Sequence, residues 1–538
     1  MSALDDALQL LRARPAAEAA GLPAGPLRDG LDASGAGFAA VGGMLGQRWG
    51  RAILELSGCI APAGTLSEGG VYHGAWIEST GTISAEVLSR FAPVVTTETT
   101  LLFARHQRDD GMIPYKVTAD GPGYSQIQIV SPLARTVWNH FLLAGRDAVY
   151  LRTMYDAMVR YDAWLERVRD TRGTGAVEAF CTFDTGHDLS PRFWHVPDRC
   201  FLGDATRFDP GNPILPFVAP DLTANVACQR EYLARIAEEL GDDPEPWRAK
   251  AAASVEALFA QCFDEADGTF YDRDATGALR RVQSDVLLRV LACEVGDDAF
   301  FRAALERYLL NSGKFLAHFG FTSIAMDDPR FDPDFTRNSW AGPVNLLSLI
   351  RAPHAFEHHG RVAELALTAE PVVAALAAAD RFPQCLDGWS GAPGFTEQYS
   401  PAILWFLDAL ERLSGIVPRP DGEVWFSGLA PTRLGHGASA DAVAASRTID
   451  GVRYELAADD DRVVVLRDGV EAFGFPRGWR VVTDRSGAPT AVVCLAATAV
   501  AGTLAIAGER RDLDLAPNDR VDLLTGLRST AGFVAPRA

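Results

Sequence analysis

Signals of redox, metal or membrane proteins are scarce in this sequence. The eight cysteines are scattered along 538 residues, and none forms a CxxC pair. Most of them lie in apolar surroundings, so we expect reduced thiols in the core. The ten histidines include a single adjacent pair, His358 and His359, and no HExxH motif. We therefore predict neither a metal site nor a cofactor.

Long apolar runs and basic clusters are also missing. No uncharged apolar segment reaches the length that a bilayer crossing requires, and the opening residues MSALDDALQLLRAR place acids ahead of any apolar run. The 50 Lys and Arg residues face 70 Asp and Glu residues, which gives a net charge of -20. Such a charge repels nucleic acids and anionic membranes. We expect a cytoplasmic protein without these partners, and homo-oligomerisation stays possible.

Helical periodicity dominates the chain from about residue 85 to residue 415. Apolar residues recur at spacings of three, four and seven in segments 151–168 and 222–240, so each segment has one stripe to bury. Further helices are expected at 255–263, 282–293, 299–310, 344–350, 362–378 and 401–413. Roughly ten to twelve helices fit in this span. They must pack on one another, and a closed double ring of helical hairpins is one economical arrangement.

After Pro418 the pattern changes to short β-branched runs separated by turn residues. The runs lie at 452–456, 463–466, 479–482, 491–495 and 503–506, and they predict a small antiparallel β domain. We divide the chain into a partly helical N-terminal segment (1–70), a mainly helical domain (71–417) and a β-rich C-terminal domain (418–538).

The segment CTFDTGHDLSPRFW, residues 181–194, combines two acids, a histidine, an arginine and aromatic residues around Gly and Pro. Burial of Asp184 and Asp188 near aromatic rings would raise their pKa values unless Arg192 compensates, so one acid could stay protonated while the other is ionised. A protonated acid can donate its proton to a leaving oxygen. The alternative is a turn that caps the next helix, with Arg192 in a structural ion pair.

This segment resembles the SGWDFSSRW and SGWDNSPR signatures of the trehalase and processing α-glucosidase families, which include mannosylglycerate and glucosylglycerate hydrolases. The Asp of that motif is the general acid in these families, and the matching residue is Asp188. Gly186 and Arg192 match the motif as well. Asp184 stands where relatives often carry Glu, and His187 replaces the usual Trp, which leaves the sugar contacts of this position open.

A second segment, GFTEQYSPAILWFL at 394–407, resembles the ExYxP motif of the same families. There the Glu activates a water molecule, so the resemblance implies that Glu397 is the general base, followed by Tyr399 and Pro401. The alternative for Glu397 is an acid that the helix dipole favours near the start of a helix.

Weaker matches occur in the same order as in these families. GAWIEST, around Trp76, resembles a WDS motif, and HQRDDGMIPYKV, which includes Gln107, resembles an NQxxDGMIP stretch. RNSWAGPVNLL resembles YWRGPVWPxxN, with Ala341 where Arg is usual, so Arg337 is the candidate to replace that arginine. The resemblance spans roughly residues 71 to 415.

Aromatic faces stack on pyranose rings, and we expect Trp194, Trp340 and Trp389 to do so, although each could instead pack in the core. The complete set of predicted substrate-binding residues is Trp76, Glu78, Gln107, Asp184, Gly186, His187, Arg192, Trp194, Arg337, Trp340, Trp389, Gln398 and Tyr399.

The resemblance implies an (α/α)6 barrel, the six-hairpin glycosidase fold, and cleavage with inversion. Asp188 would protonate the glycosidic oxygen of a small α-glucoside, oligosaccharide or glycosyl-glycerate, while Glu397 deprotonates the attacking water. Two alternatives remain at this point: a glycoside phosphorylase, in which phosphate replaces the water, and a protein that binds an oligosaccharide without cleaving it.

Overall fold

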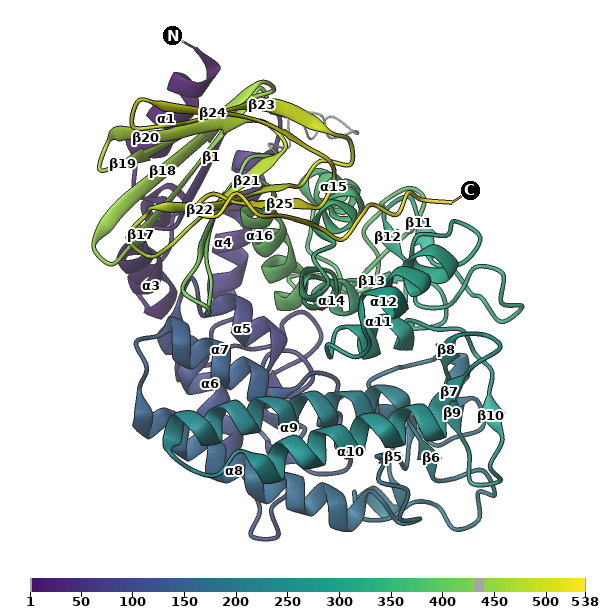
Figure 1. Ribbon diagram of the computed structural model, residues 1–538. Coiled ribbons are helices and arrows are strands. Elements are labelled where there is room, and N and C mark those ends of the chain that lie inside the picture. The colour runs from purple at the N-terminus through teal and green to yellow at the C-terminus, as the bar shows by residue number, and fades with distance from the viewer. Residues whose placement is uncertain (1, 430–439, 538) are drawn as a thin grey trace.

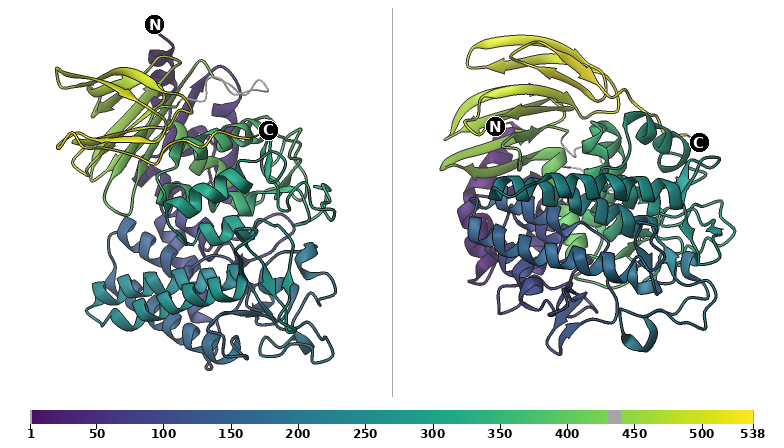
Figure 2. Two further views of the ribbon diagram at one scale, coloured as in Figure 1. Left: turned by 45° about the vertical axis from the view of Figure 1, so that its right-hand side comes forward. Right: turned by 60° about the horizontal axis from the view of Figure 1, so that its bottom comes forward.

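Two β-sheets cap one side of a mainly helical domain. The structure is a computed structural model that describes residues 2–429 and 440–537. Figure 1 shows the strands of these two sheets at the top of the view with most of the helices beneath them, and the N-terminal helix α1 (Ala3–Ala13) lies beside the sheets. The two further views in Figure 2 show the same arrangement.

Six positions around the helical domain are filled by buried helices that each contact the next. These helices are α5 (Ile83–Leu88), α7 (Leu133–Leu143), α9 (Pro220–Leu240), α11 (Val286–Leu291), α13 (Leu346–Leu349) with α14 (Ala352–His358), and α16 (Ser400–Ser414). The contacts run from α5 to α7, α9, α11 and α14, then from α13 to α16, and α16 contacts α5. In α16, apolar residues occur on nearly every side, which suits a helix that is buried all round.

A second set of helices packs outside these. The outer helices are α4 (Leu45–Gly58), α6 (Pro93–Arg105), α8 (Ala148–Val168), α10 (Glu245–Cys262), α12 (Asp298–Ala304) and α15 (Val362–Ala378). In α8 one face is buried and the other is exposed, as its spacing predicts. Asp147 starts this helix by accepting hydrogen bonds from the backbone N–H groups of Val149 and Tyr150. The predicted helices at 151–168, 222–240, 362–378 and 401–413 are confirmed.

The β-rich region consists of two antiparallel sheets. One has the order β1-β17-β18-β19-β20-β23-β24 and the other β15-β16-β21-β22-β25-β26. The strands at the predicted positions are β18 (Val452–Ala458), β19 (Arg462–Arg467), β21 (Trp479–Thr483), β22 (Pro489–Cys494) and β23 (Val500–Ile506). Phe426 of one sheet packs against Tyr454 and Phe473 of the other, so the two sheets share an aromatic core.

The first seventy residues divide between both parts of the molecule. Strand β1 (Gly37–Val41) pairs antiparallel with β17 (Ala442–Ile449), and α1 (Ala3–Ala13) packs on both strands. Helix α4 contacts both β1 and α16 of the helical domain. The first seventy residues thus contact both the sheets and the helical domain.

All eight cysteines are buried and unpaired by disulfides, as predicted. Within the described part of the chain, no helix combines the length and apolar character of a membrane span.

Arg447 of β17 ties the sheets to the helices. Its Nη1 donates to the backbone oxygen of Arg90 at 2.6 Å, and its guanidinium pairs with Glu411 of α16.

We expect Arg447→Met to lower the free energy of unfolding by about 3 kcal/mol, because a buried ion pair loses one partner. Urea denaturation measures this. The matched control is Arg485→Met, which breaks an exposed pair with Asp450 and should cost less than about 1 kcal/mol. Equal losses in the two variants would contradict this role of Arg447.

Candidate active site

A polar cavity of about 200 Å³ lies where the loops lead into the buried helices. Its wall is formed by Glu68, Tyr72, Trp76, Glu78, Tyr115, Lys116, Gln126, Gln128, Phe183, Gly186, Asp188, Arg199, Asn338, Gln384 and Tyr399. These residues come from loops that precede α5, α7, α9, α13 and α16. Segments more than three hundred residues apart in sequence therefore meet at one site.

The loop that carries Asp188 passes close to Glu78. Gly186 has a φ of 65°, and a Cβ atom there would lie 2.3 Å from Oε1 of Glu78, so any other residue would be strained and would displace the Glu78 carboxyl. The backbone oxygen of Asp188 accepts a hydrogen bond from the Trp340 N–H at 3.0 Å. The turn and this bond hold the Asp188 side chain at the cavity wall.

Burial and the nearby Glu78 carboxylate raise the pKa of Asp188 well above its ordinary value. Its Oδ2 accepts a short hydrogen bond from Nδ2 of Asn338, which acts in the opposite direction. A carboxyl group with a raised pKa stays protonated at higher pH than a free one. Asp188 can therefore hold a proton for donation.

Two further carboxyl groups face the same cavity. Burial raises the pKa of Glu68 to about 8, although a short hydrogen bond from Ser79 opposes this shift. Glu78 also has a raised pKa, because it is buried, while Arg289 and Arg351 lower it. One of its oxygens accepts from Gln128 Nε2. The cavity thus holds three acids in different electrostatic surroundings.

Aromatic rings form one side of the cavity. The ring of Tyr72 meets Trp76 edge-on with centroids 5.7 Å apart, and Trp76 meets Tyr115 in the same way at 5.6 Å. The Lys116 ammonium lies 4.9 Å from the Trp76 ring centroid. The ring centroids of Tyr399 and Tyr72 are 6.1 Å apart. A wall of rings beside amides and carboxyls suits a sugar, which presents both C–H faces and hydroxyls.

His187 and Arg192 belong to the loop that carries Asp188, but their side chains are buried and do not line the cavity. Burial and Arg289 lower the pKa of His187 to about 3, so its ring is neutral. Its Nε2 then donates to Asp285 at 2.9 Å, and its Nδ1 accepts from Arg192. Arg192 forms buried ion pairs with Asp221 at 3.0 Å and with Asp272 at 2.7 Å. These two predicted binding residues therefore support the loop.

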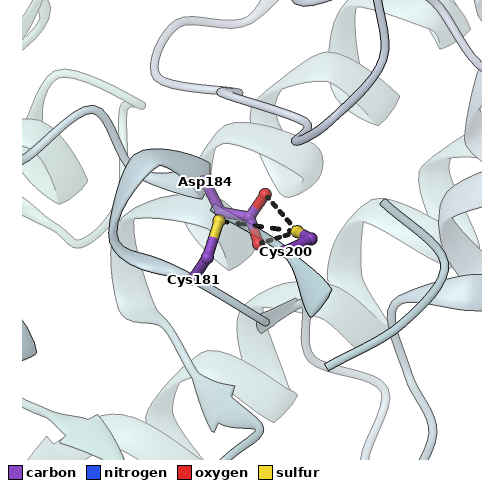
Figure 3. Close-up of side chains that lie close together, drawn as sticks. All are labelled: Cys181, Asp184 and Cys200. Carbon is purple, nitrogen blue, oxygen red and sulfur yellow. Dashed lines mark hydrogen bonds between the residues drawn. The ribbon is translucent and has the colours of Figure 1, made fainter. Parts of the chain in front are cut away.

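Asp184 also supports the loop. Both of its oxygens are within hydrogen-bonding distance of Arg169, at 2.5 and 3.2 Å, and they accept from two backbone N–H groups. Figure 3 shows it beside Cys181 and Cys200, whose sulfur atoms are 3.4 Å apart. Among the described residues, this is the one group with three potential metal ligands in proximity. Because Arg169 already neutralises the carboxylate, we assign no ion to it.

The predicted tryptophans differ in their surroundings. Trp340 is buried and lies between the His187 ring and the Arg289 guanidinium, so it packs in the core. Trp194 and Trp389 are 49% and 50% exposed and stand outside the cavity wall. Trp76 is the predicted tryptophan that lines the cavity.

Three predicted polar contacts also lie away from the cavity. Arg337 is half exposed and pairs with Asp332 and Asp334. Gln107 donates to two backbone oxygens, those of Gly111 and Ala157, at 2.8 Å each. The side-chain amide of Gln398 donates to the backbone oxygen of Glu55 on α4 at 3.1 Å.

Glu397 is exposed and does not line the cavity. Its neighbours Thr396 and Gln398 have positive φ values of 61° and 49°, which non-glycine residues adopt at some energetic cost. Tyr399, two residues further on, does line the cavity. Glu397 is therefore exposed and close in sequence to a residue of the cavity wall, but it is not itself part of that wall.

Sequence reasoning missed most of the polar wall. Gln126 and Gln128 alternate with isoleucines in YSQIQIV, and amides inside an apolar run are a usable signal. Glu68 lies ten residues before Glu78, and Gln384 belongs to no recognised motif. Their membership depends on tertiary contacts that spacing does not reveal.

Comparisons with known proteins identify relatives of this chain. The family described as mannosylglycerate hydrolase MGH1-like glycoside hydrolase domain matches residues 73–402. A mannosylglycerate hydrolase from Thermus thermophilus, solved with Tris and D-glycerate, is 18% identical, with a TM-score of 0.57 over 67% of this chain and 99% of that chain. The neutral trehalase of Saccharomyces cerevisiae is 11% identical, with a TM-score of 0.51 over 65% of this chain and 74% of that chain.

A family GH78 rhamnosidase from Bacillus sp. GL1 is 12% identical, with a TM-score of 0.53 over 78% of this chain and 40% of that chain. No curated protein matches the sequence. The structural neighbours share the fold of glycosidases, as the motifs predicted.

The raised pKa of Glu68 makes stability depend on pH. Such an acid contributes its full stability below the unfolded value of 4.5, and this contribution is lost as pH rises towards about 8. We expect Glu68→Gln to remove that loss, so the variant's Tm relative to the parent should rise by about 2 °C or more between weakly acidic and alkaline pH. Scanning calorimetry measures it. The control, Glu245→Gln, changes an exposed acid, and a pH-independent difference for Glu68→Gln would refute the argument.

Proposed function

The chain belongs to the family of mannosylglycerate hydrolase MGH1-like glycoside hydrolases, and from this premise we propose that it cleaves a small α-linked glycoside with inversion. The observation that carries the proposal is Asp188, a buried carboxyl with a raised pKa at the wall of a sugar-sized cavity. We also propose that the contacts from α5 round to α16 close the inner ring of an (α/α)6 barrel.

Asp188 serves as the general acid. The glycosidic oxygen becomes a poor leaving group unless it receives a proton as the bond breaks. Burial and the neighbouring Glu78 carboxyl raise the pKa of Asp188 well above its ordinary value, which favours the protonated form that the acid needs. The leaving alcohol takes the proton, and Asp188 becomes a carboxylate.

Glu397 serves as the general base, as its motif implies. Inverting glycosidases hold their two carboxyl groups about 6.5–9.5 Å apart, so that a water molecule fits between the base and the sugar. Because Glu397 is exposed and does not line the cavity, we propose that residues 396–398 rearrange when the substrate binds. The positive φ values of Thr396 and Gln398 are strained conformations, and such a rearrangement would relieve this strain. Glu68 already faces the cavity, but its raised pKa keeps it protonated at neutral pH, which disfavours a role as base.

The cavity volume of about 200 Å³ suits a single pyranose ring. The rings of Trp76, Tyr72 and Tyr399 would contact the faces of the pyranose ring. Glu78 would accept hydrogen bonds from its hydroxyls, and the amide of Gln128 would donate to them. Lys116 and Arg199 add positive charge to the wall. We propose that these two residues bind a carboxylate on the leaving group, which makes glycosyl-glycerates the first substrates to test.

We expect Asp188→Asn to lower kcat by about 100-fold to 10,000-fold, because an amide cannot donate the proton, while binding of the released sugar persists. Glu397→Gln should cause a loss of similar size. Initial rates with glucosylglycerate and mannosylglycerate measure turnover, and calorimetric titration measures binding. The matched control is Asp334→Asn, an acid paired with exposed Arg337, which should keep its rate.

A rate for Asp188→Asn within tenfold of the parent would rule out this acid. If Glu397→Gln kept its rate while Glu68→Gln lost it, the base would be Glu68 instead.

A further inference from the structure

The geometry points to Asn338, held in place by Gln384 and Tyr72, as the positioning residue that sets the acidity of Asp188. This inference rests on the proposed function, since it concerns the residue that donates the proton. Of the three side chains, Asn338 lies within the RNSWAGPVNLL segment, whereas Tyr72 and Gln384 belong to no recognised motif.

The chain of hydrogen bonds runs along the cavity wall. The Tyr72 hydroxyl donates to Oε1 of Gln384 at 3.0 Å, and Nε2 of Gln384 donates to Oδ1 of Asn338 at 3.0 Å. Nδ2 of Asn338 then donates to Oδ2 of Asp188. All four residues line the cavity, and each comes from a different loop.

The middle of this chain is fixed by the backbone around it. The N–H of Gln384 donates to the Phe395 oxygen at 2.9 Å, and its own oxygen accepts from the Leu346 N–H at 2.8 Å. The Gln384 side chain is buried. The Tyr72 ring packs against Phe395 and Tyr399. The positions of Tyr72 and Gln384 are therefore set before any sugar enters.

These contacts decide which way the Asn338 amide faces. An amide has one oxygen acceptor and one nitrogen donor. Because Oδ1 of Asn338 accepts from Gln384, Nδ2 is the group that meets Asp188. A protonated carboxyl group accepts hydrogen bonds best at its carbonyl oxygen, so the bond from Asn338 to Oδ2 of Asp188 favours the proton on Oδ1.

The same bond stabilises the carboxylate that remains after proton donation. The charged groups that act on Asp188 are Glu78 and Asp198, which oppose its ionisation, and Arg289, which favours it. Burial also opposes ionisation, whereas the Asn338 bond favours it. The protonated form of Asp188 is thus favoured before cleavage. After proton transfer, its carboxylate is stabilised by the hydrogen bond that Asn338 already donates. Without Asn338 it would be a weaker acid.

The test measures pH profiles of Asn338→Leu. On the alkaline side, kcat/KM falls as the acid loses its proton. Loss of a donor to the ionised form should move this fall upward by about one pH unit. It should also lower kcat about tenfold for an alkyl glycoside, with KM changed less than threefold. Gln384→Leu frees the Asn338 amide and should move the profile in the same direction by less.

Asn338→Asp places a second carboxyl against Asp188, and the two groups would share a proton. It should move the alkaline limb further upward than Asn338→Leu does. The matched control is Asn139→Leu, which removes a largely buried amide that donates to Glu86 away from the cavity. The profile of this control should not move. Thermal unfolding of each variant checks that the fold is kept.

A folded Asn338→Leu variant with reduced kcat and an unmoved alkaline limb would overturn the inference, since the residue would then be only structural. Failure of the proposed function has a different signature. With a 2,4-dinitrophenyl α-glycoside, whose leaving group needs no proton, Asp188→Asn should turn over without the alkaline limb. If that limb persisted in Asp188→Asn, Asp188 would not be the acid.

Discussion

The ion pairs of Arg192 with Asp221 and Asp272 are the interaction on which the candidate site depends. They fasten the loop of residues 181–200 to the start of α9 and to strand β9 (Asp272–Arg273). A buried guanidinium is tolerated there because two carboxylates satisfy it. The same guanidinium also fixes the neutral ring of His187. Loss of Arg192 would leave Asp221 and Asp272 buried without their partner, and the loop that carries Asp188 would lose its anchor.

The acidic segment therefore divides into two kinds of residue. Asp188 and Gly186 face the cavity, whereas Asp184, His187 and Arg192 form a rigid layer beneath it. The charges of this layer are paired. Burial at this place in the fold, together with Glu78, raises the pKa of Asp188. Burial of this loop thus has two effects: its ion pairs hold the loop in place, and the pKa of Asp188 is raised.

Many helices and strands could be predicted because their sequence patterns are local. The helical periodicity of residues 151–168 and the short β-branched runs after Pro418 each depend only on their own segment. The place of Gly186 and Asp188 at the cavity wall could also be predicted, because both lie within one short motif. Glu68 and Gln384 could not, because they enter the cavity through contacts with residues more than three hundred positions away.

Predictions for the tryptophans failed to separate packing from binding for a similar reason. An indole in Trp340 or Trp389 has the same sequence signature whether it is enclosed or exposed. For Glu397 the motif and the structure differ: the motif implies a base, but the residue is exposed and does not line the cavity.

The central claim is that Asp188 and a base on the opposite side of the sugar cleave an α-glycoside with inversion. Proton NMR of the anomeric signals, recorded in the first minutes of cleavage of glucosylglycerate, mannosylglycerate and α-linked disaccharides, tests it most directly. The account predicts that the β-anomer of the released sugar appears first and that mutarotation then produces the α-anomer. Release of the α-anomer first would contradict it.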